Sequence, residues 1–128
     1  MAREKSATLI VEAVDLELDS SSSAVFLLGD LNSPESEIAY RSIAGHMHDL
    51  REVCPTTYGH YNTFTGFERK KSDLSRIDHI FGSMADGWEG KIYAVEESHF
   101  DDGKWLSDHR PVIADVYIGK ALKAGGEG

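Results

Sequence analysis

The segment Val25-Phe26-Leu27-Leu28-Gly29-Asp30-Leu31-Asn32 decides the fold, because an apolar run ends in acid and amide side chains. Four consecutive apolar residues before a glycine are typical of a central strand buried on both faces. Asp30 and Asn32 are then expected where that strand ends, and ligand sites of α/β sheets gather at strand ends. The residues leave a second interpretation open, in which Asp30 and Asn32 only begin the next helix.

Helical and strand patterns flank this segment. Residues 5–18 carry apolar side chains at a roughly helical period, which predicts a packing helix. Ser33, Pro34 and Glu35 form a typical helix start, so a second helix is expected from there to about Ala44. Residues 46–55 are expected to form an irregular or short helical link with Leu50 and Val53 buried, and residues 58–67 a loop followed by a short strand. Further strands are predicted at 77–81, 91–96 and 112–118.

Length and composition bound the class of protein. A chain of 128 residues with 41% hydrophobic content predicts one globular domain, here residues 1–119, followed by a glycine-rich tail at 120–128 that is expected to fray. No apolar run approaches the roughly 20 residues of a membrane helix, and Met1 leads into charged residues. We therefore expect a soluble chain with no signal segment and no membrane partner.

The formal charge of −9 argues against a broad basic surface for nucleic acid, although it does not exclude a nuclease that meets phosphate with a metal ion. The basic run Arg69-Lys70-Lys71 is open to two interpretations, a solvated loop, which is favoured, or a phosphate grip. The single cysteine, Cys54, cannot form an internal disulfide, and a buried thiol is favoured over a nucleophile. No oxidising compartment is implied.

Polar residues gather at strand ends in three places. These are Gly29 to Asn32, Arg76 to Phe81, and Ser107 to Val112. Taken alone, each is weak, because Asp78 could be a satisfied polar group in a strand and Asp108-His109 could open a turn before Pro111.

Together, and in this order, the three segments resemble the C-terminal motifs of the endonuclease/exonuclease/phosphatase family. Its glycine-aspartate-x-asparagine pattern is met by Gly29 to Asn32, its arginine-isoleucine-aspartate strand by Arg76 to Phe81, and its serine-aspartate-histidine motif by Ser107 to His109. The segment Thr63 to Phe67 is also similar to a threonine-aromatic-x-glycine-phenylalanine segment of the family. The resemblance covers about residues 5–118.

The resemblance implies a role for each motif residue in the attack of water on a phosphoester. Asp30 would position or deprotonate the water, and Asn32 would donate its amide to a phosphate oxygen. His109 would contact the scissile phosphate, while Asp78 would hold the second ring nitrogen of His109. Asp108 would lie at the metal site, for which Mg²⁺ or Mn²⁺ is expected.

The chain lacks counterparts of two further family motifs, an asparagine after the first strand and a metal-binding glutamate commonly preceded by glutamine. It contains no glutamine, and its only asparagines are Asn32 and Asn62. We therefore expect the C-terminal half of a four-layer α/β sandwich, with one mixed, mostly antiparallel sheet that carries helices on one face. The other face is expected to be apolar and open.

Two functions follow from these expectations. The first is a divalent-metal-dependent phosphoester hydrolase of the phosphodiesterase or nuclease type, with an incomplete site and a phosphoester substrate, nucleic acid included. The alternative is a non-catalytic fragment that acts as a self-associating module. In either case the expected partner is a second copy in a homodimer, or a missing N-terminal half.

The remaining polar and aromatic residues have structural interpretations. None of the other histidines has the spacing of a zinc site. Arg76 and Arg110 fit phosphate contacts and strand-end salt bridges equally well. For Phe64 and Phe67, packing is favoured over stacking against a base.

Overall fold

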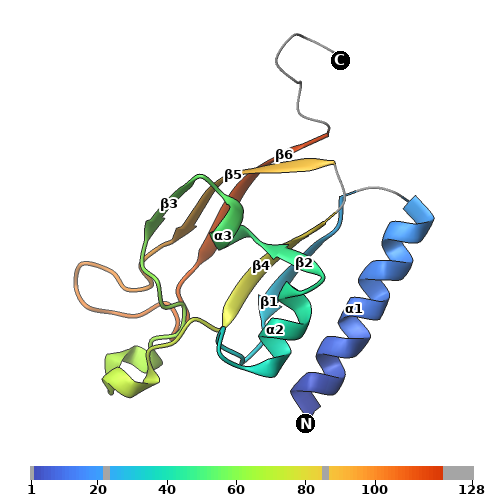
Figure 1. Ribbon diagram of the computed structural model, residues 1–128. Coiled ribbons are helices and arrows are strands. Elements are labelled where there is room, and N and C mark those ends of the chain that lie inside the picture. Colours follow the sequence, from blue (N-terminus) through green and yellow to red (C-terminus); the bar gives the residue numbers. More distant parts are fainter. Residues whose placement is uncertain (1, 22–23, 85–86, 120–128) are drawn as a thin grey trace.

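The computed structural model describes residues 2–21, 24–84 and 87–119 (Figure 1). The predicted tail at 120–128 lies outside these residues. The helices are α1 (Ala2–Ser21), α2 (Ile38–Ala44) and α3 (Leu50–Val53), with 3-10 turns η1 (Gly66–Glu68) and η2 (Lys71–Asp73). The strands are β1 (Phe26–Asp30), β2 (Met47–Asp49), β3 (Thr56–Gly59), β4 (Asp78–Ser83), β5 (Trp88–Val95) and β6 (Val112–Ile118).

The strands form two three-stranded sheets. In the first sheet β4 lies between β1 and β2 and is antiparallel to both. In the second sheet β5 pairs in parallel with β3 and antiparallel with β6. The predicted mixed, mostly antiparallel α/β fold is confirmed. The strands are divided between two sheets, however, because β6 takes its ladder partners from β5 and only lies near β4.

Helices α1 and α2 cover one face of the first sheet (Figure 1). On α1, Ala7, Val11 and Val14 are buried, and their spacing places them on one side of the helix. They pack in a cluster with Ala39, Tyr40, Ile43, Met47 and Phe81. The amphipathic pattern at residues 5–18 thus predicted this helix correctly, although α1 extends further at both ends.

The opposite face of the first sheet is covered in part by the second sheet. Ile80 of β4 is buried in a cluster with Leu50, Cys54, Tyr93 and Val95. The expectation that this face is uncovered is therefore wrong for Ile80, while Leu28 of β1 remains 64% exposed. The expectation that β1 is a central strand buried on both faces is also wrong for the described residues, because β1 lies at a sheet edge.

Two local predictions differ from the structure. The helix expected from Ser33 begins at Ile38, because a turn closes first between the Glu37 N–H and the Pro34 carbonyl. The link expected at 46–55 contains the short helix α3, in agreement with one of its two interpretations, and also the strand β2, which was not expected. Leu50 is buried as expected, whereas Val53 is 40% exposed. Strand β3 ends at Gly59, whose φ of +90° and close approach to the Val95 backbone leave no room for a side chain.

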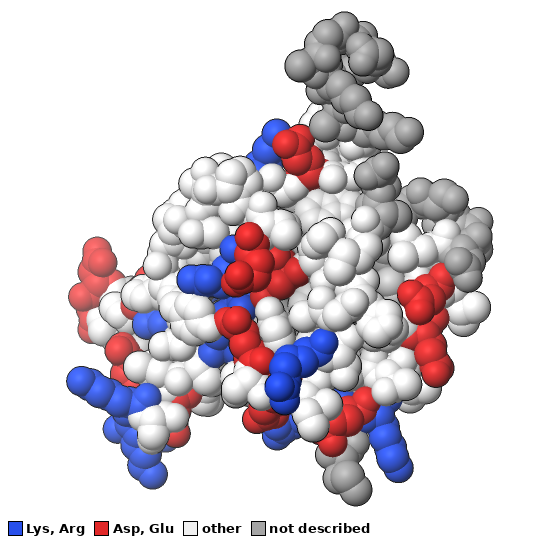
Figure 2. Space-filling model, viewed as in Figure 1, with Lys and Arg blue, Asp and Glu red and all other residues white. Residues whose placement is uncertain are grey.

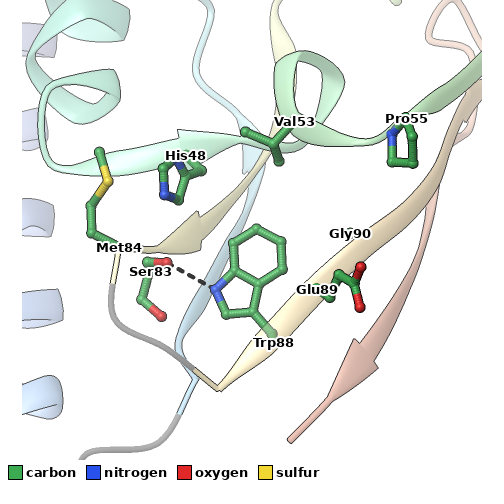
Figure 3. A pocket seen from close by; sticks show the side chains of 8 residues that line it. All are labelled: His48, Val53, Pro55, Ser83, Met84, Trp88, Glu89 and Gly90. Atoms are coloured by element: carbon green, nitrogen blue, oxygen red, sulfur yellow. Dashed lines mark hydrogen bonds between the residues drawn. The ribbon is translucent and has the colours of Figure 1, made fainter. Parts of the chain in front are cut away.

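An open pocket of about 450 Å³ lies at the Ser83 end of β4, remote from Asp78 at the other end of the strand (Figure 3). Its wall includes Trp88, whose indole N–H donates to the Ser83 carbonyl at 2.8 Å. None of the predicted site residues lines it. Among the described residues, no helix has the length and apolar character to cross a bilayer.

Candidate active site

The site begins with two carboxylates that lie opposite each other on the neighbouring strands β1 and β4. Asp30 at the end of β1 is the register partner of Asp78 at the start of β4. Side chains alternate along a strand, so both project to the face opposite the one where Leu27 and Phe81 meet the helices. Like charges placed directly opposite each other are destabilising, so this pair needs a compensating cation.

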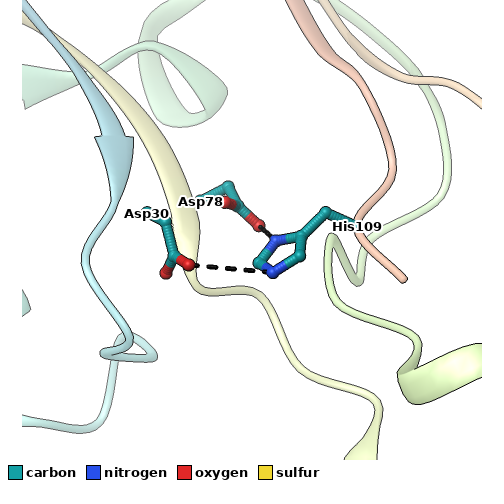
Figure 4. A group of neighbouring side chains, drawn as sticks. All are labelled: Asp30, Asp78 and His109. Atoms are coloured by element: carbon teal, nitrogen blue, oxygen red, sulfur yellow. Dashed lines mark hydrogen bonds and ion pairs between the residues drawn. The ribbon is translucent and has the colours of Figure 1, made fainter. Parts of the chain in front are cut away.

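His109 supplies that compensation from the loop before β6 (Figure 4). Its Nδ1 lies 2.8 Å from Asp78 Oδ2, and its Nε2 lies 3.7 Å from Asp30 Oδ2. The predicted contact between Asp78 and His109 is present, and the three residues converge although they come from distant parts of the chain. Their ligand atoms lie within 4.8 Å of one another.

The imidazole of His109 is held in the charged form more readily than a free imidazole. Its partial burial would lower the pKa, but the hydrogen bond and charge of Asp78, together with the charges of Asp30 and Asp108, outweigh burial and raise the pKa. With Nδ1–H donated to Asp78, the Nε2–H of the imidazolium faces Asp30. The arrangement can present one N–H donor beside one exposed carboxylate.

Thr63 fixes the strand that carries Asp78. Its buried hydroxyl oxygen accepts from the backbone N–H groups of Ile77 and Asp78, at 3.0 and 3.1 Å. Its carbonyl accepts from the Arg110 N–H, next to His109. Phe64 then packs its ring on the imidazole of His109, with 5.1 Å between ring centroids. The segment resembling the family's threonine-aromatic motif thus aligns the two halves of the Asp78–His109 pair.

Asn32 lies beside the cluster without joining it through its side chain. The residue is exposed, has a left-handed φ of 50°, and donates its backbone N–H to Asp30 Oδ1 at 2.8 Å. This local turn orients the Asp30 carboxylate, a common use of aspartate two residues before the donor. The expected contact of the Asn32 amide with phosphate stays a prediction.

Asp108 also lies at the edge of the cluster. Its carbonyl accepts from the N–H and the hydroxyl of Thr65, at 2.7 and 2.9 Å. Its carboxylate is not part of the group formed by Asp30, Asp78 and His109 among the described residues. The predicted role of Asp108 as a metal ligand therefore stays a prediction.

The donor set fits a divalent cation in part. Asp30 is 39% exposed and offers carboxylate oxygen, the donor that Mg²⁺ and Mn²⁺ prefer, and Asp108 carries the same group nearby. Asp78 and His109 are engaged with each other. Asp30 and Asp108 would hold such a cation through their carboxylate oxygens, and water, substrate or another polypeptide would supply the other ligands.

The two arginines of the motifs form structural salt bridges. Arg76 is almost fully buried, with Asp49 oxygens at 2.7 and 2.8 Å and Glu35 at 2.9 Å. The Nε of Arg110 lies 3.4 Å from Glu97 Oε2, and its guanidinium donates to the Asn62 carbonyl at 2.9 Å. Sequence reasoning missed Asp49 because it lay in a segment without a strand pattern. The signal that could have found it was the need of a buried arginine for an acidic partner.

A carboxylate pair and a histidine beside the strand ends of a mixed α/β fold are groups that can serve general acid–base chemistry. The model of the Endonuclease/Exonuclease/phosphatase family matches residues 2–109, and the chain belongs to this family.

Solved structures of the family share the fold. An endonuclease/exonuclease/phosphatase from Bacteroides vulgatus is 26% identical with a TM-score of 0.78, over 91% of this chain and 44% of its own. A mannosyl-6-phosphatase from Bacteroides thetaiotaomicron is 28% identical with a TM-score of 0.76, over 91% of this chain and 46% of its own. The chain therefore spans less than half the length of these proteins. No curated protein matches it.

Proposed function

We propose that this chain carries the water-activating and phosphate-contacting part of a divalent-metal-dependent phosphoester hydrolase. The observation that supports the proposal most is the geometry of Asp78, His109 and Asp30, with contacts of 2.8 and 3.7 Å at one rim of the fold. Family membership and the similarity to a mannosyl-6-phosphatase support phosphoester chemistry in general. A phosphodiester, nucleic acid included, and a phosphomonoester are both candidate substrates.

The residues divide the work by their chemistry. Asp30 is exposed and can accept a proton from the attacking water, while its second oxygen is held by the Asn32 N–H. His109 can donate Nε2–H to a phosphoryl oxygen, where negative charge develops in the transition state. Asp78 orients the imidazole and raises its pKa, which favours the charged form. A divalent ion held by Asp30 and Asp108 oxygens would neutralise phosphate charge.

A second candidate function is a non-catalytic module that acts by association. A groove of about 430 Å³ between β1, β4 and β6 favours it, because its lining is apolar and includes the exposed Leu28. The partial metal shell also fits this interpretation.

Hydrolysis of bis-p-nitrophenyl phosphate and of mannose 6-phosphate, measured with Mg²⁺ and with Mn²⁺, separates the two candidates. Asp30→Ala and His109→Ala should each reduce any turnover by at least about 100-fold, the usual contribution of a positioned acid or base. Asp15→Ala, on the exposed side of α1, is the matched control and should leave turnover unchanged. Turnover that survives both site substitutions would contradict the assignment, and absence of turnover in the unmodified chain would favour the association module.

A further inference from the structure

The turn that follows Thr65 has an unusual backbone. Gly66, Phe67 and Glu68 have φ values of 56°, 60° and 57°, so three consecutive residues are left-handed and two of them are not glycine. Side chains rarely adopt this conformation because the Cβ atom approaches the following carbonyl. Thr65 holds the turn, since its hydroxyl accepts from the Phe67 N–H at 3.1 Å and its carbonyl from the Glu68 N–H at 2.8 Å. Strain held in this way is a recurrent feature of binding sites.

The turn presents Phe67 next to Trp105 from the loop before His109. The two ring centroids lie 5.9 Å apart at an interplanar angle of 80°, so the rings form a corner. Trp105 is itself supported by His99, with 4.9 Å between ring centroids, and by the Leu106 N–H bond to the Ser98 carbonyl. Phe67 remains 39% exposed. An exposed aromatic on a strained turn is a poor choice for packing alone.

The corner is tied to the candidate active site by short chain connections. Thr65, two residues before Phe67, makes two hydrogen bonds to the carbonyl of Asp108, the neighbour of His109. Trp105 lies in the same loop, four positions before His109 along the chain. Any displacement of the corner would therefore be transmitted to the loop that carries the imidazole.

One cation lies against the corner. The Arg69 guanidinium lies 5.3 Å from the centroid of the Phe67 ring. The η1 and η2 region carries basic and acidic side chains together, because its sequence includes Glu68 and Asp73 as well as Lys70 and Lys71 (Figure 2). Arg69 is therefore the cation at this turn that could meet an anionic ligand.

We propose that Phe67 and Trp105 form a specificity site for the organic group of a small phosphoester, and that this group presents the apolar face of a ring. The proposal rests on the function proposed above, because the phosphate is placed at His109. Aromatic corners bind ring faces through stacking and C–H contacts. The acidic balance of the chain disfavours long nucleic acid. The ligand class is therefore a phosphate monoester whose organic group contains a ring, of the sugar or nucleoside type.

The test compares a ring-bearing ester with an open-chain one. Phenyl phosphate and ethyl phosphate are titrated by calorimetry on the unmodified chain, and by fluorescence on Trp88→Phe, in which Trp105 is the remaining tryptophan. We expect phenyl phosphate to bind about five- to tenfold more tightly, the lower range of stacking on an aromatic side chain. Mannose 6-phosphate and adenosine 5′-monophosphate then show whether the ring is a sugar or a base. Equal affinities for phenyl and ethyl phosphate, or binding of neither, would overturn the proposal.

Three variants separate this site from structural effects and from the proposed chemistry. Phe67→Gly should abolish the preference for phenyl phosphate while keeping or raising the melting temperature, because glycine tolerates a φ of 60°. Phe100→Ala, an exposed phenylalanine of the neighbouring loop, should change neither. His109→Ala should weaken both esters equally and leave their ratio intact. If Phe67→Gly lowers the melting temperature and keeps the preference, Phe67 is a packing residue, even where hydrolysis itself is demonstrated.

Discussion

Two histidines, His79 in the core and His109 at the rim, carry opposite pKa shifts, because their surroundings differ. His79 is 2% exposed, and burial lowers its pKa, although its hydrogen bond to the Ser33 carbonyl opposes this. His109 is only partly buried, and the carboxylates around it raise its pKa. The pKa of one imidazole is thus lowered within the core, and the pKa of the other is raised at the rim.

The first prediction concerns the charge on His109. Asp78→Asn removes the negative charge and keeps the size of the side chain, so the pKa of His109 should fall toward its ordinary value. Where the chain is active, turnover should fall by about 10²- to 10⁴-fold. An NMR titration of the ring protons measures the pKa directly, with His109→Ala identifying the resonance. An unchanged titration curve in Asp78→Asn would show that the contact does not control the imidazole.

The second prediction concerns stability at mildly acidic pH. The pKa of His79 is lowered in the folded state, whereas the unfolded chain titrates near about 6.5, so the unfolded state binds more protons below that pH. The contribution of His79 is fully present above about pH 6.5 and is lost as the pH falls from there toward the folded-state pKa. Urea unfolding between pH 7 and pH 5 should show the decrease, and His79→Gln should flatten it. His109, whose pKa is raised, contributes with the opposite sign over this range, so the test is the difference between the two chains. The same pH dependence in His79→Gln as in the unmodified chain would contradict the shift.

At the scale of single residues, the sequence predicted the contact that chemistry requires but not the details around it. The pairing of Asp78 with His109, which lie 31 positions apart in the chain, followed from the resemblance to the family, and the structure contains it. The turn of Asn32 back to Asp30 and the engagement of the Asp108 carbonyl by Thr65 did not follow. They depend on local backbone geometry, which a motif does not encode.

At the scale of elements, a buried ionic network anchors the start of β4. Arg76 joins Asp49 at the end of β2 to Glu35 in the segment after β1, and Asp49 also accepts from the Tyr40 hydroxyl at 2.5 Å. The pKa of Tyr40 is raised by burial and by this bond. The network therefore fixes three segments beside the strand end that carries Asp78.

The third prediction tests this network. Asp49→Ala would leave Arg76 buried with a reduced countercharge, which costs about 3–5 kcal/mol of unfolding free energy in comparable cases. Arg3→Ala is the matched control, because the Arg3–Glu37 pair has the same 2.9 Å length as Arg76–Glu35 but side chains that are 53% and 44% exposed. It should cost about 0–1 kcal/mol. Urea denaturation of both variants measures the two losses of unfolding free energy. Equal losses would show that burial does not make the Arg76 network more important for stability than the exposed pair.

Elements with a strong side-chain pattern were predictable, and those set by tertiary contacts were not. The alternation along residues 112–118 gave the bounds of β6 as the structure has them. By contrast, Ser33 and Pro34 predicted a helix start. The Ser33 carbonyl instead forms a hydrogen bond with the His79 ring, and the helix begins at Ile38. Strand β3 pairs in parallel with β5, a distant segment, so its local sequence offered little signal.

At the scale of the whole molecule, the sequence predicted that an apolar sheet face exists but not how much of it is exposed. The sequence indicated an apolar face on the side of the first sheet away from the helices, and Ile80 and Leu28 do lie there. The second sheet covers Ile80, which a reading of one sheet could not anticipate. What remains is the groove of about 430 Å³, with Leu28 at 64% and Ile113 at 46% exposure.

The last prediction is that this groove is covered by a second copy of the chain. A contiguous apolar surface is costly in water, and a two-fold dimer buries the same groove on both partners. Two copies together also have roughly the length of one of the solved relatives, of which a single copy spans 44 to 46%. Light scattering over a dilution series should give the mass of a dimer. The interface of that dimer should have the standard size of about 1,600 Å² or more.

Leu28→Lys should shift the equilibrium to monomer, because it places a charge in the apolar interface at a modest cost to the monomer itself. Leu9→Lys on α1 is the matched control, since Leu9 is 66% exposed and lies on another face, and it should leave the dimer intact. A monomer at every concentration, or equal effects of the two lysines, would exclude the second copy as the occupant and direct the search to a different polypeptide.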